Sequence, residues 1–133
     1  MEKLVWKLRI SILWIFLAVS MSAAMILFFM GPGVVEEIIA GEIEGMEISG
    51  LVLIVFAFFW IIPLIMAFLT LVLKDTVNRY TNAILGIFFA IFYIIDISGH
   101  LSKGEEFGGH HLMGIIGVIV ALFIIWHAWK WPK

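Results

Sequence analysis

Residues 50–73 read GLVLIVFAFFWIIPLIMAFLTLVL, a stretch without a single charged side chain. A helix needs roughly 20 apolar residues to cross about 30 Å of hydrocarbon, so this stretch is long enough to span a bilayer. Pro63 lies in its middle. Because proline has no N–H, it leaves the carbonyl of Phe59 without its helical partner and favours a kink. The stretch therefore predicts a transmembrane helix.

Three further apolar runs have the same character. They cover about residues 10–30, 80–98 and 110–129. Of the 133 residues, 64% are hydrophobic and 14% are charged, whereas soluble domains are about 45–50% apolar and about 25% charged. The sequence therefore predicts an all-α fold, an integral membrane four-helix up-down bundle, with residues 1–133 forming a single transmembrane domain.

The segment 34–48 is different, because glutamates alternate with apolar residues along it. It is too acidic and too short to span a membrane, yet its isoleucines favour burial. We expect a short extracytoplasmic interfacial helix that lies on the membrane surface and is broken near Gly41 and Gly45.

The charges predict the orientation. If the N-terminus is cytoplasmic, Lys103 is the only one of the eight basic residues in an extracytoplasmic segment, while most acidic residues lie in those segments. Basic residues concentrate in cytoplasmic loops of membrane proteins. We therefore expect a multi-pass protein of the cell membrane with cytoplasmic N- and C-termini.

Several classes of function are excluded or disfavoured by composition. The chain has no cysteine, which rules out disulfides, thiolate metal ligands and thiol catalysis. No basic patch indicates a nucleic-acid partner, and no phosphate-binding loop or nucleophile elbow is present. The middle of the predicted membrane layer is nearly free of charge, which argues against an ion-coupled transporter.

The strongest candidate site lies between the third and fourth runs. Asp96 and His100 are four residues apart and share a helix face. His110 shares a face with Gly114 and Gly117, and small residues allow close helix packing in membranes. The two helices are joined by a short loop, so we expect Asp96, His100 and His110 to approach one another. His111 should point roughly 100° away from His110.

Carboxylate and imidazole groups together suit a divalent transition metal or a proton relay. The predicted metal ligands are Asp96, His100 and His110, with His111, Glu105 and Glu106 as possible additional ligands. The alternative interpretation is that these residues only sit at the water interface and hydrogen-bond the loop.

The sequence leaves several functions open. One is a small polytopic membrane protein that binds a metal or small ligand at its extracytoplasmic end. A second is a membrane-embedded enzyme that uses Asp96 and the histidines. A third is a small oligomeric transporter or channel, or an accessory subunit of a membrane complex. Expected partners are the lipid bilayer and further copies of this chain, because four helices form a thin bundle.

Three short segments carry a family resemblance. They are residues 8–16 (LRISILWIF), 31–37 (GPGVVEE) and 78–82 (NRYTN). Together they resemble an uncharacterised family of small four-helix prokaryotic integral membrane proteins, over roughly the first two-thirds of the chain. Tyr80 stands where the family usually has tryptophan, and the histidine-containing loop has no counterpart in the resemblance. The resemblance implies a four-helix architecture and no established activity.

The orientation can be tested by cysteine labelling, because the chain contains no cysteine of its own. Single cysteines replace Glu44 and Lys133, and intact cells are treated with a membrane-impermeant reagent. We expect labelling at position 44 and none at position 133, because the basic residues mark the cytoplasmic side. Labelling at position 133 but not at 44 would reverse the assignment.

Overall fold

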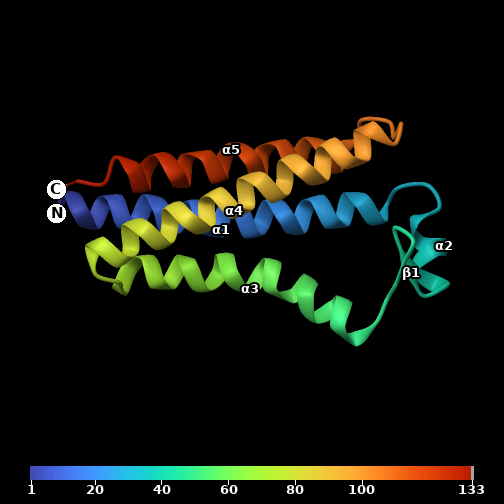
Figure 1. Ribbon diagram of the computed structural model, residues 1–133, viewed down its shortest axis with the longest axis horizontal. Coiled ribbons are helices and arrows are strands. Elements are labelled where there is room, and N and C mark those ends of the chain that lie inside the picture. Colours follow the sequence, from blue (N-terminus) through green and yellow to red (C-terminus); the bar gives the residue numbers. More distant parts are fainter. Residues whose placement is uncertain (133) are drawn as a thin grey trace.

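The computed structural model describes residues 1–132, so Lys133 of the orientation test lies outside the described residues. Four long helices lie side by side, and a short helix and a small hairpin connect the first two of them (Figure 1). The elements are α1 (Glu2–Phe29), α2 (Val34–Ile39), β1 (Glu42–Ile43), β2 (Met46–Glu47), α3 (Gly50–Val72), α4 (Asp75–Ser102) and α5 (Gly109–Trp129). The predicted all-α class is confirmed.

The helices α1, α3, α4 and α5 are each long and apolar enough to cross a membrane. Both ends of the described chain lie at one end of the bundle together with the α3–α4 turn, here called the terminal end (Figure 1). The opposite end, here called the loop end, carries α2, the hairpin and the α4–α5 loop (Figure 1).

The third predicted span is longer than expected at both ends. It begins at Asp75 instead of about residue 80 and continues to Ser102 instead of 98. The interval of residues 74–79 between the second and third predicted spans is therefore mostly helical, and the turn consists of Leu73 and Lys74, whose backbones are extended. The reason is that Asn78 is fully buried and bonds to α3, which draws the start of α4 into the bundle. The extension at the other end places His100 on a helix.

The segment 34–48 is helical only as far as Ile39, so the expected surface helix is wrong for its second half. There β1 and β2 pair antiparallel, with Ile43 opposite Met46. The two turn residues, Glu44 and Gly45, have φ angles of 51° and 78°. Two consecutive positive φ angles are typical of a type I′ hairpin turn, and this turn directs Glu44 toward the bundle.

The four long helices do not pack equally. The helix α5 lies against both α4 and α1, and α1 also lies against α3. In contrast, α3 and α4 make few contacts although only a short turn joins them. They diverge toward the loop end, where α3 bends away from the other helices (Figure 1).

Glycines allow the close approach of α4 and α5. A Cβ atom added at Gly117 would lie 3.0 Å from Cζ of Tyr93, and one added at Gly86 would lie 2.8 Å from Cγ1 of Ile125. Such distances leave no space for a methyl group unless a neighbour moves. Small residues at helix interfaces in membranes have this role.

Near the terminal end, four fully buried side chains join α1, α3 and α4. The indole Nε1 of Trp14 donates to Oδ1 of Asn82 at 2.6 Å, and Oγ1 of Thr70 donates to the same oxygen at 3.3 Å. The amide of Asn82 donates to Oδ1 of Asn78 at 2.6 Å, and the amide of Asn78 donates to the carbonyl of Thr70 at 2.6 Å. We call this set the asparagine network.

Further bonds from α1 fix its position against both neighbours. The indole of Trp6 donates to the carbonyl of His127 on α5 at 2.7 Å. The hydroxyl of Ser11 donates to the carbonyl of Ala67 on α3 at 2.6 Å. The helix α1 therefore contacts α5 on one side and α3 on the other.

Replacing Asn82 by alanine should destabilise the protein. The change leaves Trp14 Nε1 and Asn78 Oδ1 buried without a partner, and each such group costs about 1–3 kcal/mol. We expect a clear loss of thermal stability in detergent. The matched control is Ile84→Ala, which removes an exposed side chain from the same helix. Equal stability of the two variants would show that the asparagine network does not support the fold.

Replacing Gly117 by alanine should also destabilise, because the added methyl group meets the Tyr93 ring at 3.0–3.2 Å. Gly99→Ala is the control, since nothing lies within 4 Å of a Cβ there, and alanine favours helix over glycine by about 1 kcal/mol. We therefore expect a lower melting temperature for the first variant and an equal or higher one for the second. If both variants melt alike, the close approach at Gly117 is not required.

Candidate metal site and adjoining pocket

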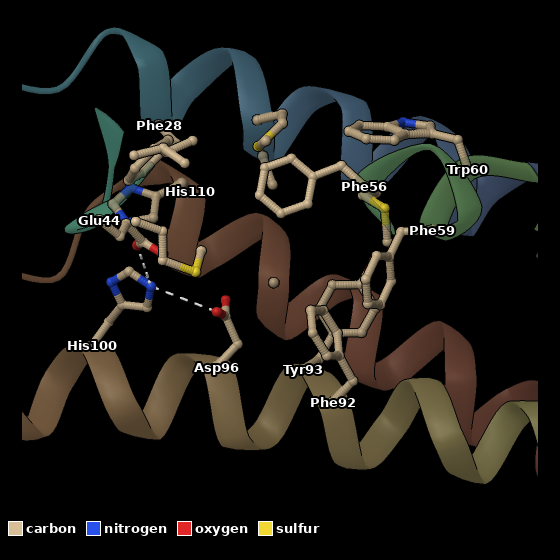
Figure 2. A pocket seen from close by; sticks show the side chains of 16 residues that line it. Phe28, Glu44, Phe56, Phe59, Trp60, Phe92, Tyr93, Asp96, His100 and His110 are labelled. Carbon is tan, nitrogen blue, oxygen red and sulfur yellow. Dashed lines mark ion pairs between the residues drawn. The ribbon is translucent and has the colours of Figure 1, made fainter. Parts of the chain in front are cut away.

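Five chemically active side chains meet at the loop end. His100 lies in the last turns of α4, and His110 and His111 lie in the first turn of α5. Glu105 comes from the loop between these helices, and Glu44 comes from the hairpin turn. Residues from distant parts of the chain thus converge on His100 (Figure 2).

Both ring nitrogens of His100 face carboxylates. Its Nδ1 lies 2.7 Å from Oε2 of Glu105, and its Nε2 lies 2.8 Å from Oε1 of Glu44. An imidazolium ring, which donates at both nitrogens, satisfies both contacts. Burial raises the pKa of the Glu44 carboxyl above its ordinary value, while the nearby charge of His100 acts in the opposite direction.

Four possible metal donors lie close together at the loop end. One ligand atom from each of His100, Glu105, His110 and His111 can be chosen so that all lie within 4.8 Å of one another. Atoms that bind one tetrahedral ion at about 2.0–2.1 Å lie about 3.4 Å apart. Oε2 of Glu105 lies 2.7 Å from Nδ1 of His100 and 3.8 Å from Nε2 of His111. Small side-chain movements would therefore bring the donors to ligand spacing.

His111 differs from the other three in its hydrogen bonding. The backbone N–H of Gly108 donates to Nδ1 of His111 at 2.9 Å and so caps the start of α5. A neutral ring that accepts at Nδ1 carries its proton on Nε2, and this atom faces Glu105 at 3.8 Å. His111 therefore has no free lone pair for a metal ion, and the remaining three residues are the candidate ligands.

Two imidazole nitrogens at this site are buried without a partner. They are Nε2 of His110 and Nε2 of His111. Buried polar atoms in proteins usually have a hydrogen-bond partner, so such exceptions call for an explanation. The ring of His110 lies against His111 at a centroid distance of 3.9 Å and against Phe28 at 5.7 Å. These contacts hold it beside the other donors.

A pocket of about 300 Å³ adjoins the donors on the side of Glu44 and Asp96. All three predicted metal ligands, Asp96, His100 and His110, line it. Asp96 and His100 point into the pocket from α4, as Figure 2 shows. Asp96 Oδ1 lies 3.5 Å from Nε2 of His100, on the side of the ring away from Glu105. Glu106 is exposed and, within residues 1–132, lies outside the donor group.

The sequence interpretation differs from the structure at two points. His111 is the more buried of the two adjacent histidines, with 2% of its surface exposed, whereas His110 was expected to be the inward one. The reason is that α5 packs against two helices, which buries a wider face than a single stripe. The sequence reasoning also missed Glu44. The sequence feature that could have identified Glu44 is the Glu44–Gly45 pair between Ile43 and Met46, because a glycine in a two-residue connection suits a hairpin turn.

Comparison with known proteins identifies a family but no function. No curated protein and no solved structure matches this chain. A family model, described as a family of unknown function, matches residues 3–133. The match is more extensive than the resemblance found in the first two-thirds of the sequence, and it includes the histidine-containing loop and α5. The chain therefore belongs to the family of unknown function DUF6326.

Proposed function

We propose that this protein is a multi-pass cell-membrane protein that binds one divalent transition metal ion at its extracytoplasmic end. The ligands are His100, Glu105 and His110. The observation that carries the proposal is the group of four donor residues whose ligand atoms lie within 4.8 Å of one another. His110 belongs to this group, and its Nε2 is buried without a partner. A metal ion would provide the partner that this nitrogen lacks.

The surroundings of His100 support the same arrangement. Metal-binding histidines commonly donate their second N–H to a carboxylate, which fixes the ring and raises its basicity. If Nδ1 of His100 binds the metal beside Glu105, its Nε2–H can donate to Glu44, which lies 2.8 Å away. Glu44 then orients a ligand, and His111 orients Glu105 from the other side.

The proposed ligand set leaves room for a further ligand. Two histidines and one carboxylate are the protein ligands of many catalytic zinc sites, where a water or substrate takes the fourth position. Structural zinc sites, in contrast, usually have four protein ligands. The three-residue set therefore favours an ion that can exchange ligands, and the pocket lined by His100 and His110 lies next to it.

The proposed orientation rests on charge. Lys3 and Lys7 lie at the terminal end and pair with Asp75 at 2.8 Å and 3.7 Å. The glutamates of α2 and the hairpin lie at the loop end, together with Glu105 (Figure 1). Because positive residues remain on the cytoplasmic side, the loop end and its metal site face outward.

Metal binding can be tested on purified protein stripped with a chelator and titrated with Zn²⁺ or Co²⁺. We expect one ion per chain, and a Co²⁺ absorption spectrum typical of tetrahedral coordination. His100→Ala and His110→Ala should abolish binding, because each removes a ligand. His111→Ala should weaken binding about 10–100-fold, as expected for a residue that orients a ligand.

The control for these variants is His127→Ala, which removes a histidine at the terminal end and should bind metal like the wild type. Wild-type affinity in the His110→Ala variant would refute the proposed site. Complete loss in His111→Ala with a correctly folded protein would instead make His111 a ligand.

A further inference from the structure

The pocket beside the metal site has walls that suit an apolar ligand. Its volume of about 300 Å³ is at the lower end of the roughly 300–1,000 Å³ typical of small-molecule sites. Residues from α1, the hairpin, α3, α4 and α5 line it. Six of them are phenylalanine, tryptophan or tyrosine: Phe28, Phe56, Phe59, Trp60, Phe92 and Tyr93. Phe56 and Trp60 lie across the cavity from Asp96, whereas Phe92 and Tyr93 lie beside it on α4 (Figure 2).

The polar end of the pocket is acidic. Asp96 and Glu44 line it, and ionised carboxylates can only accept hydrogen bonds. The contact of Asp96 with His100, at 3.5 Å, is too long for a good hydrogen bond. An ionised group within a membrane helix generally faces a partner or a functional cavity. Asp96, whose side chain is half exposed, therefore lacks a close donor within the protein, and the pocket that it lines offers a place for one.

One residue that lines the pocket, Tyr93, has an unpartnered hydroxyl group. Oη of Tyr93 is buried without a hydrogen-bond partner, and only 5% of the residue is exposed. Tyr93 lies one helical turn from Asp96, and its ring occupies the space that a Cβ atom at Gly117 of α5 would need. A hydroxyl both donates and accepts, so both Tyr93 and Asp96 can accept a hydrogen bond from an N–H-bearing group.

We propose that the pocket binds a lipophilic amine, a ligand with an apolar chain and a protonated ammonium head. The apolar chain would contact the walls, and the head would donate to Asp96 and Tyr93. Aromatic faces attract cations as well as apolar groups, which favours this class over a neutral or anionic amphiphile. The carboxylates of Glu44, Asp96 and Glu105 outnumber the positive charge of a protonated His100, so the pocket end attracts cations.

This proposal does not depend on the metal. Glu105 and His111 lie on the Nδ1 side of His100, whereas Asp96 and the pocket lie on its Nε2 side. A metal ion bound on the Nδ1 side of His100 leaves Asp96 and Tyr93 available to bind the amine. The two proposals can therefore fail separately when ligand binding is measured in the presence of a chelator.

The test compares three ligands that share one chain, namely decylamine, decanol and decanoate. Binding to the protein in an uncharged detergent with chelator is measured by calorimetry at neutral pH. We expect decylamine to bind at least tenfold more tightly than decanol, and decanoate to bind most weakly. Equal affinity for all three would overturn the proposal in favour of a site for neutral chains, and tighter binding of decanoate or no binding at all would also overturn it.

Variants identify the groups that recognise the head. Asp96→Asn should remove the preference for decylamine over decanol, and Tyr93→Phe should reduce it severalfold. Glu47→Gln is the matched control, because it removes the same charge from an exposed position of the hairpin outside the pocket. If Glu47→Gln lowers the preference as much as Asp96→Asn, the selectivity reflects general surface charge and the site is wrong. Asp96→Glu should restore the preference, and decanol binding that is retained by the Asp96→Asn variant shows that this variant is folded.

Discussion

Hydrocarbon offers no hydrogen bonds, so a polar side chain between membrane helices must find its partners within the protein. The asparagine network meets this requirement, since every one of its four side chains is fully buried and bonded to another member. The network joins α1, α3 and α4 at one depth. A shift of any of these helices along its axis would break several bonds at once. The relative positions of three of the four long helices therefore depend on it.

Holding α3 and α4 together near one end has a consequence at the other. The two helices separate toward the loop end, because little packing joins them beyond the network. The space between them is closed only in part, by the aromatic contact of Phe59 with Phe92 at 4.4 Å and by the hairpin. The part of this space that stays open forms the pocket. It lies beside the imidazole ring of His100, which the donor group and the pocket share.

Much of the fold could be predicted from apolar length alone, because no other structure lets such runs satisfy their backbone in lipid. The helix ends could not be predicted, since the start of α4 depends on where Asn78 finds a partner in α3. Helical spacing did identify Asp96, His100 and His110 as residues of one region. It could not identify Glu44, whose position depends on the positive φ angles of a hairpin turn. Nor could it rank His110 against His111, because the burial of α5 depends on two neighbours rather than one.

At the terminal end, the start of the first helix and the end of the last helix are close to each other. The first turns of α1 and the last turn of α5 lie together, joined by the bond from Trp6 to the carbonyl of His127. Chain ends that lie close together can be linked with little rearrangement. Because they also lie on the same side of the bundle, two copies fused head to tail would keep the same orientation in the membrane. Gene duplication of this chain would therefore produce a parallel repeat, whereas a protein with an odd number of spans would produce an inverted one.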